Sequence, residues 1–209
     1  MTVTAPVQIP GLHASAPQRL PFAPSLEIRA FVLERRQGNV LVYSTDTLDD
    51  PDGVSRWYLN HGHEAMFVSG AVTAPLFVHE RDRRSVEAKA HVRATFSRRH
   101  TLDDDFEVIP TPGHTPGATT YLWDSGEHRF LFTGDTIFLR DGEWVAAVLD
   151  SSDRASYLES LELIRGLDFD VLIPWAASAG ELPYAVTSRA DARRRIDAIV
   201  ERVRAGGDG

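Results

Sequence analysis

The stretch Thr111-Pro112-Gly113-His114-Thr115-Pro116-Gly117 decides how the rest of this sequence is interpreted. The residues around His114 are all turn formers, which fix a loop with exposed backbone. A side chain held on a stiff loop loses less entropy when it binds a ligand. His114 is therefore a candidate metal ligand, although a plain Pro/Gly connector that happens to contain a histidine has the same composition.

Two further stretches place polar side chains just after expected strands. His61-Gly62-His63-Glu64 follows a short strand expected at 56–59. Residues two apart on an extended chain point the same way, so the imidazoles of His61 and His63 can converge on one ion. Phe130-Leu131-Phe132-Thr133-Gly134-Asp135-Thr136 is an apolar strand that ends in Gly-Asp. Taken singly, each stretch is also typical of an ordinary polar loop or turn.

Together, and in this order, the three stretches resemble the metallo-β-lactamase superfamily over residues 26–179. The resemblance implies an α+β fold, a four-layer αββα sandwich with its metals at one edge. It also implies that His61, His63 and His114 form one metal site, with Asp135 as a metal ligand beside it. Members of the family hydrolyse different bonds, so the fold alone does not fix the substrate.

The first motif departs from the family's usual His-x-His-x-Asp-His. Ala65 and Met66 stand where the family has the Asp and the final His, which serve the second metal. Neither side chain can take over the work of that Asp and His. If the backbone matches the family, the adjacent Glu64 points away from the pocket.

The last family ligand is also missing. The segment Pro174-Trp175-Ala176-Ala177 replaces the family's Pro-Gly-His, so Ala176 occupies the histidine position and Trp175 the glycine position. The size of the indole suggests that Trp175 fills the space left by the lost ligand. Of the second metal site only Asp135 remains.

The remaining side chains predict a single zinc ion on His61, His63, His114 and Asp135, because three histidines with an open fourth position suit catalytic zinc. Iron or manganese can also occupy such a site. Asp135 is the expected catalytic residue, positioning a water molecule activated by the metal. The expected function is hydrolysis of an ester, thioester, lactone or phosphoester. The alternative is a degenerate, non-catalytic member that binds a small molecule or a protein.

Composition narrows the function classes. The 209 residues include no cysteine, which excludes disulfides, thiolate catalysis and cysteine zinc sites. The net charge of -8 disfavours nucleic acid as a partner, so a small-molecule substrate is expected. No apolar run of about 18 residues and no leader pattern is present, so a cytoplasmic protein without a membrane span is expected.

Patterning predicts an extended Pro-rich arm at 1–24, a candidate homodimer contact, followed by one domain at 25–209. Only residues 45–55 separate the early hairpin from the first motif, so the helix that the family usually has there is expected to be absent. The edge of the site is then either open or covered by the arm. The other expected elements are a hairpin of 26–33 with 39–44, a helix at 81–94, a strand at 106–109, a hairpin of 119–123 with 129–133, strands at 144–149 and 171–173, and helices ending near 166 and 206.

Overall fold

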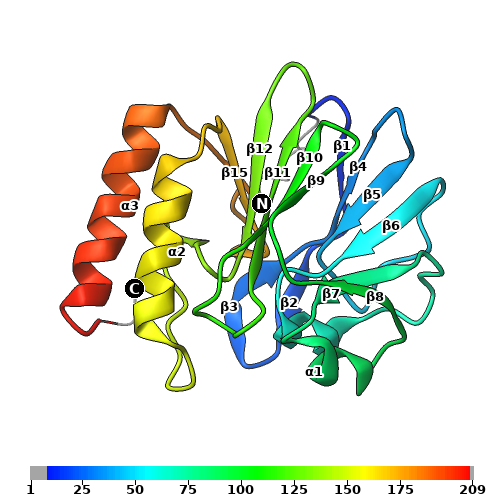
Figure 1. Ribbon diagram of the computed structural model, residues 1–209, viewed down its shortest axis with the longest axis horizontal. Coiled ribbons are helices and arrows are strands. Elements are labelled where there is room, and N and C mark those ends of the chain that lie inside the picture. The colour runs from blue at the N-terminus through cyan, green and yellow to red at the C-terminus, as the bar shows by residue number, and fades with distance from the viewer. Residues whose placement is uncertain (1–8, 208–209) are drawn as a thin grey trace.

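The computed structural model describes residues 9–207 and shows two six-stranded β-sheets packed face to face (Figure 1). The first sheet has the order β1 (Leu12–Ala14), β4 (Phe31–Leu33), β5 (Asn39–Val42), β6 (Val54–Tyr58), β7 (Leu76–His79) and β8 (Val92–Phe96). The second has the order β17 (Ala185–Val186), β15 (Val171–Pro174), β12 (Arg129–Gly134), β11 (Thr119–Asp124), β10 (Phe106–Pro110) and β9 (His100–Leu102).

A third, five-stranded sheet lies at one end of the sandwich, at the bottom of Figure 1. Its order is β14 (Glu143–Val145), β13 (Phe138–Arg140), β16 (Ala176–Ser178), β3 (Ala23–Ile28) and β2 (Gln18–Leu20). This sheet joins the beginning of the chain to the segments that follow β12 and β15. It therefore brings residues near 20 next to the motifs at 135 and 175.

Aromatic side chains fill the space between the two large sheets. The rings of Phe31, Tyr43 and Phe132 contact one another edge to face at 6.0–6.1 Å between centroids. Such edge-to-face pairs stabilise a core beyond their burial alone. The alternation of inward and outward side chains along a strand directs two rings from β12, those of Phe130 and Phe132, into this core.

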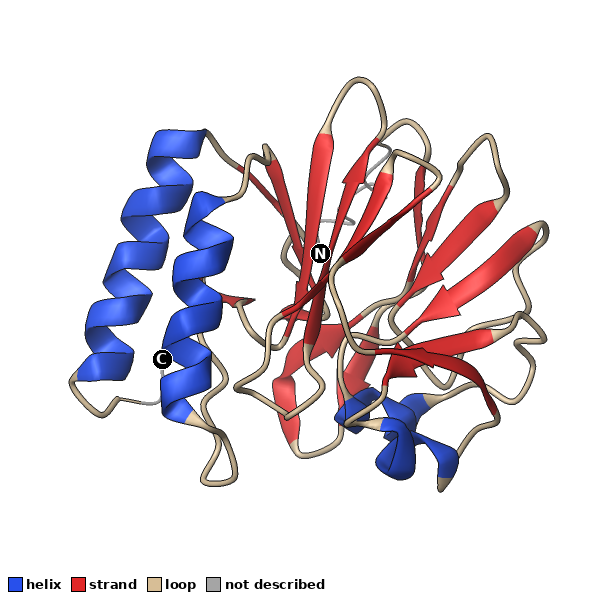
Figure 2. Cartoon of the chain, viewed as in Figure 1, coloured by secondary structure: helices blue, strands red, loops and turns tan. Residues whose placement is uncertain are grey.

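Helices α2 (Arg154–Gly166) and α3 (Arg189–Arg204) cover the outer face of the second sheet (Figure 2). Asp153 begins α2 by accepting hydrogen bonds from the backbone N–H groups of Ala155 and Ser156, which satisfies two free donors of the first turn. Both helices are where the periodicity predicted them.

The other outer face carries a thinner layer, made of α1 (Arg83–Glu87), the 3-10 turn η1 (Gly62–Phe67) and loops. As expected, residues 45–53 contain no helix. Parallel strands such as β5 and β6 are normally joined through a crossover helix. Here the loop 44–53 is instead tied to the loop 68–75, because the Ser69 hydroxyl donates to Leu48 O and Thr73 donates to Asp50. The four layers confirm the predicted α+β sandwich of the metallo-β-lactamase type.

Three expected elements were wrong in extent. The helix expected at 81–94 is only α1, and 92–96 form β8, because pairing with β7 outweighs local helix preference. The segment 26–33 is two strands in different sheets that part at Arg29 and Ala30. The strand expected at 144–149 stops at Val145.

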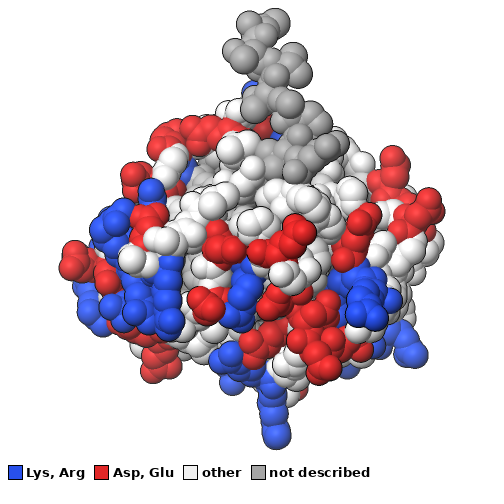
Figure 3. Space-filling view, turned by 90° about the horizontal axis from the view of Figure 1, so that it is seen from above, with Lys and Arg blue, Asp and Glu red and all other residues white. Residues whose placement is uncertain are grey.

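The predicted N-terminal arm is extended in its described part. Residues 1–8 lie outside the described residues, while 12–14 and 18–20 form β1 and β2. Leu12 and Leu20 are buried there. Within residues 9–207, no helix is long and apolar enough to cross a membrane. On the face shown in Figure 3, basic side chains are interspersed with acidic ones.

Candidate metal centre

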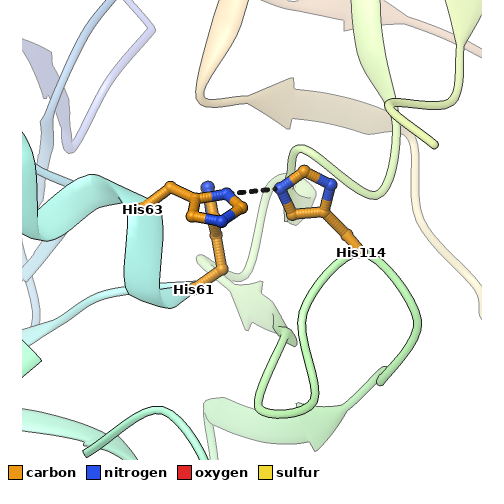
Figure 4. A group of neighbouring side chains, drawn as sticks. All are labelled: His61, His63 and His114. Carbon is orange, nitrogen blue, oxygen red and sulfur yellow. Dashed lines mark hydrogen bonds between the residues drawn. The ribbon is translucent and has the colours of Figure 1, made fainter. Parts of the chain in front are cut away.

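Three histidines from two loops converge on one point (Figure 4). One nitrogen from each of His61, His63 and His114 lies within 4.8 Å of the other two. His61 has extended backbone at the start of η1, whereas His63 lies inside this 3-10 turn. The two imidazoles therefore meet at a strand-to-turn transition, and not along a continuous strand as the sequence suggested. His114 comes from the loop after β10.

Hydrogen bonds fix which nitrogen of each ring faces the centre. His114 donates from Nδ1 to Ala147 O at 2.7 Å, so its Nε2 carries the lone pair and faces the centre. His61 Nδ1 faces two acceptors, Asn60 Oδ1 at 3.1 Å and Glu64 Oε1 at 3.2 Å. His63 Nδ1 lies 3.1 Å from His114 Nε2. Second partners such as those that orient His61 and His114 are typical of metal ligands.

A cation would satisfy the remaining nitrogen of His61. His61 Nε2 is buried, makes no hydrogen bond in the described chain and lies only at ion-pair distance from Asp135. A buried polar nitrogen without a partner is costly unless something else satisfies it. Asp135 Oδ2 lies 3.4 Å from this nitrogen and 3.6 Å from His114 Nε2. The structure thus brings together all four predicted ligands, and three imidazoles with one carboxylate suit a zinc-like ion.

Without a metal, the centre holds a proton on His61. Burial disfavours the charged imidazole, but Asp135 and Glu64 outweigh it and raise the pKa of His61 to about 10. Burial, reinforced by the charge of His61, lowers the pKa of His114 to about 4. Burial opposes ionisation of Asp135, yet the neighbouring histidines keep its pKa below the ordinary value. A cation would take the place of that proton.

Asp82 joins the two ligand loops and was missed by the sequence analysis. Its Oδ2 accepts hydrogen bonds from Gly62 N at 2.8 Å and from the Thr115 hydroxyl at 2.6 Å. Its Oδ1 accepts from Gly117 N at 2.9 Å. One buried carboxylate therefore holds the loop of His61 and His63 against the loop of His114.

Gly62 and Gly117 allow the two histidine loops to lie this close to Asp82 and Ser85. A Cβ on Gly117 would lie 2.6 Å from Asp82 Cγ, and one on Gly62 would lie 2.4 Å from Ser85 Oγ. Gly113 has φ +141°, and a Cβ there would lie 2.4 Å from Tyr157 Cα at the start of α2. The glycines of both motifs thus serve close packing as well as turn geometry.

Glu64 lies behind the centre, as predicted, and does not line the cavity in front of it. Its Oε1 accepts from the backbone N–H groups of Asn60 and His61 at 2.7 and 3.1 Å. Burial raises the pKa of Glu64, while His61 opposes the shift. Glu64 is therefore a positioning carboxylate for His61, a role that the sequence analysis did not assign.

A cavity of about 520 Å³ opens in front of the histidines. Met66 and Ala176, which replace family ligands, form part of its wall, and Trp175 packs at 5.3 Å from the ring of His61. The Trp175 indole also donates to Ser44 O at 2.9 Å. Trp175 thus occupies the side of the centre where it was expected. Leu20, Phe22 and Ala23, which belong to the predicted arm, form part of the cavity wall.

The remaining histidines stay outside this cluster. His79 is buried, and its Nδ1 accepts from Arg81 N at 3.2 Å. His79 also packs edge to face on Phe96. It is a structural side chain of the first sheet.

Comparison with known proteins gives the family. The metallo-β-lactamase superfamily profile matches residues 33–176, more than half of the chain. The metallo-β-lactamase FIM-1 of Pseudomonas aeruginosa, solved in a mono-zinc form, superposes with TM-score 0.64 and 15% identity, covering 91% of this chain and 90% of that one. An archaeal superfamily protein of Sulfolobus tokodaii gives TM-score 0.61 and 17% identity, covering 91% and 86%.

Among curated proteins, a hydroxyacylglutathione hydrolase of Erwinia tasmaniensis is 49% identical over 41 residues. That match takes in 20% of this chain and only 15% of the relative. The two solved structures, both under 25% identical, show the fold alone. The family profile and the shared fold together establish that the chain belongs to the metallo-β-lactamase superfamily.

Proposed function

We propose that this protein is a metal-dependent hydrolase that works with a single ion, most simply zinc, held by His61, His63 and His114. The observation that carries the proposal is the convergence of one nitrogen from each of the three rings within 4.8 Å, with the buried Nε2 of His61 at ion-pair distance from Asp135 and without a hydrogen bond in the described chain. A non-metal pocket has no need for three oriented imidazoles around one point.

A single ion is favoured by what surrounds the centre. Ala65, Met66 and Ala176 supply no ligand, and the indole of Trp175 lies against His61. A two-metal clamp requires ligands on both sides of the bridging position. The likeness to a metallo-β-lactamase solved in a mono-zinc form is compatible with one ion.

A bound divalent ion would supply Lewis acidity, which lowers the pKa of water and polarises a carbonyl or phosphoryl oxygen. The chain's own residues provide the geometry. Asp135 stays ionised beside the histidines, so it accepts a hydrogen bond from the attacking water and orients it. Its lowered pKa makes it a weaker base than the usual catalytic carboxylate.

The proposed reaction is hydrolysis of an ester, thioester, lactone or phosphoester. The local similarity to a hydroxyacylglutathione hydrolase and the fold shared with a quorum-quenching lactonase support the hydrolase class. The latter structure superposes at TM-score 0.52 with 13% identity. The bond type is left to experiment.

Metal analysis of the purified protein tests the proposal. We expect about one zinc per chain in the wild type, its loss in His114→Ala, and its retention in His128→Ala, a matched change at a half-exposed histidine paired with Asp170. No zinc in the wild type at stoichiometric supply contradicts the proposal, and two ions per chain contradict the single-ion form. Bound zinc without turnover on a panel of esters, thioesters, lactones and phosphoesters would favour the alternative, a non-catalytic binding module.

A further inference from the structure

The cavity beside the metal centre is built mainly of apolar side chains. Exposed large apolar residues are unusual on a protein surface when they gather in one place. Five such residues occur in the described chain, and three of them, Phe22, Met66 and Leu149, line this one cavity. Leu20, Leu26 and Val148 extend the apolar wall. The cavity therefore favours a ligand with a sizeable apolar body.

The otherwise apolar lining includes one cationic side chain, that of Arg140. The polar residues of the wall are His63, His114, Asp135 and Arg140, and the first three belong to the metal centre. Arg140 lies on β13, where it shares a side of the strand with Phe138, because side chains alternate along a strand. Its guanidinium lies over the Phe138 ring at 4.9 Å from the centroid.

Arg140 is free to bind a ligand. Within residues 9–207 its guanidinium has no hydrogen-bond or ion-pair partner, and the residue is exposed. Other arginines of this chain, such as Arg35 and Arg165, are paired with carboxylates. A planar guanidinium held over a ring presents its N–H groups in a fixed fork that matches a carboxylate.

We propose that the substrate is amphipathic, with an apolar acyl or aryl body against the wall formed by Phe22, Met66 and Leu149, and with a carboxylate on Arg140. The hydrolysed bond then lies at the histidines, which line the same cavity. The inference that this ligand is a substrate rests on the proposed function. The chemical class of the ligand follows from the lining of the cavity alone.

Two probes separate the ligand class from the reaction. The first is a pair of esters with zinc-loaded protein, p-nitrophenyl hexanoate and the mono-p-nitrophenyl ester of adipic acid, which differ by a terminal carboxylate. We expect a preference of about fivefold in kcat/KM for the carboxylate ester, as for a partly exposed ion pair. Arg140→Met should abolish that preference and Arg140→Lys should restore part of it. Arg98→Met, the same change at an exposed arginine outside the cavity, should leave it intact.

The second probe is 1-anilinonaphthalene-8-sulfonate, an apolar body with an anionic group, whose binding is followed by fluorescence without any turnover. Arg140→Met should weaken its binding about fivefold, and Arg98→Met should not. If no ester is hydrolysed while the dye still distinguishes the two variants, the proposed function fails and the ligand class stands. Equal dye affinity in the wild type and Arg140→Met, or equal kcat/KM for the two esters in the wild type, would overturn the inference.

Discussion

Replacing Asp82 by asparagine should loosen the metal centre without removing a ligand. The side chain keeps its size, but an amide offers one acceptor oxygen in place of two. In the wild type, Oδ1 accepts from Gly117 N, and Oδ2 accepts from Gly62 N and the Thr115 hydroxyl. In either orientation of the amide, one backbone N–H then faces an NH₂ group.

The expected loss in the free energy of unfolding follows from the one backbone N–H group that loses its acceptor. The Thr115 hydroxyl can rotate and accept from the amide, so its bond survives. The stranded N–H is buried, and leaving one buried donor without a partner costs about 1–3 kcal/mol. We expect the free energy of unfolding of metal-free protein to fall by that amount. Zinc affinity should fall about tenfold to a hundredfold, the usual effect of losing a partner that orients metal ligands.

Urea denaturation with chelator present measures the first effect, and competition with a chromophoric zinc chelator measures the second. Asp50→Asn is the matched control, because Asp50 also accepts from a backbone N–H and a hydroxyl, both of Thr73, but is remote from the centre. The control should leave zinc affinity unchanged. Asp82→Asn with wild-type zinc affinity would refute the view that Asp82 positions the two ligand loops.

Two other predictions follow from the same region. Because the folded pKa of His61 is about 10 against an ordinary 6.5, the stability due to its proton is present below pH 6.5 and is lost as pH rises toward 10. Metal-free protein should therefore lose Tm between pH 7 and 9.5, and Asp135→Asn should flatten that loss; an unchanged slope would speak against the His61–Asp135 pair. Gly113→Ala should cost about 3 kcal/mol or more in urea denaturation, since its Cβ would lie 2.4 Å from Tyr157 Cα at φ +141°. Gly142→Ala, with φ +78° and open space, should cost only about 1 kcal/mol, and equal losses would contradict the packing argument.

The sequence was sufficient to bring the candidate ligands together because they lie in three short motifs whose order is itself distinctive. His61, His63, His114 and Asp135 meet as expected. The position of Trp175 beside His61 also followed from the substitutions around it. These predictions needed only local pattern and order along the chain.

The roles of Asp82 and Glu64, which support the candidate ligands, could not be predicted from local pattern and order along the chain. Asp82 lies 33 residues before Thr115, in a segment that was expected to be an exposed helix, so nothing near it in sequence indicates a buried carboxylate. Its burial depends on tertiary packing of α1 against η1, which brings Gly62 within reach. Glu64 was correctly expected to turn from the pocket, but its hydrogen bonds to Asn60 and His61 depend on the 3-10 turn, which the motif alone does not show.

The loop that replaces a helix between β5 and β6 has a consequence for how the first sheet opens. Residues 44–53 and 68–75 cover Trp57 mainly through a few side-chain bonds, such as those from Ser69 and Thr73, in place of a helical ladder of backbone bonds. Segments with few backbone hydrogen bonds exchange their amide protons through small local openings. The amide protons on the flank of the sheet around Trp57 are therefore expected to exchange faster than those of the strands inside the sandwich.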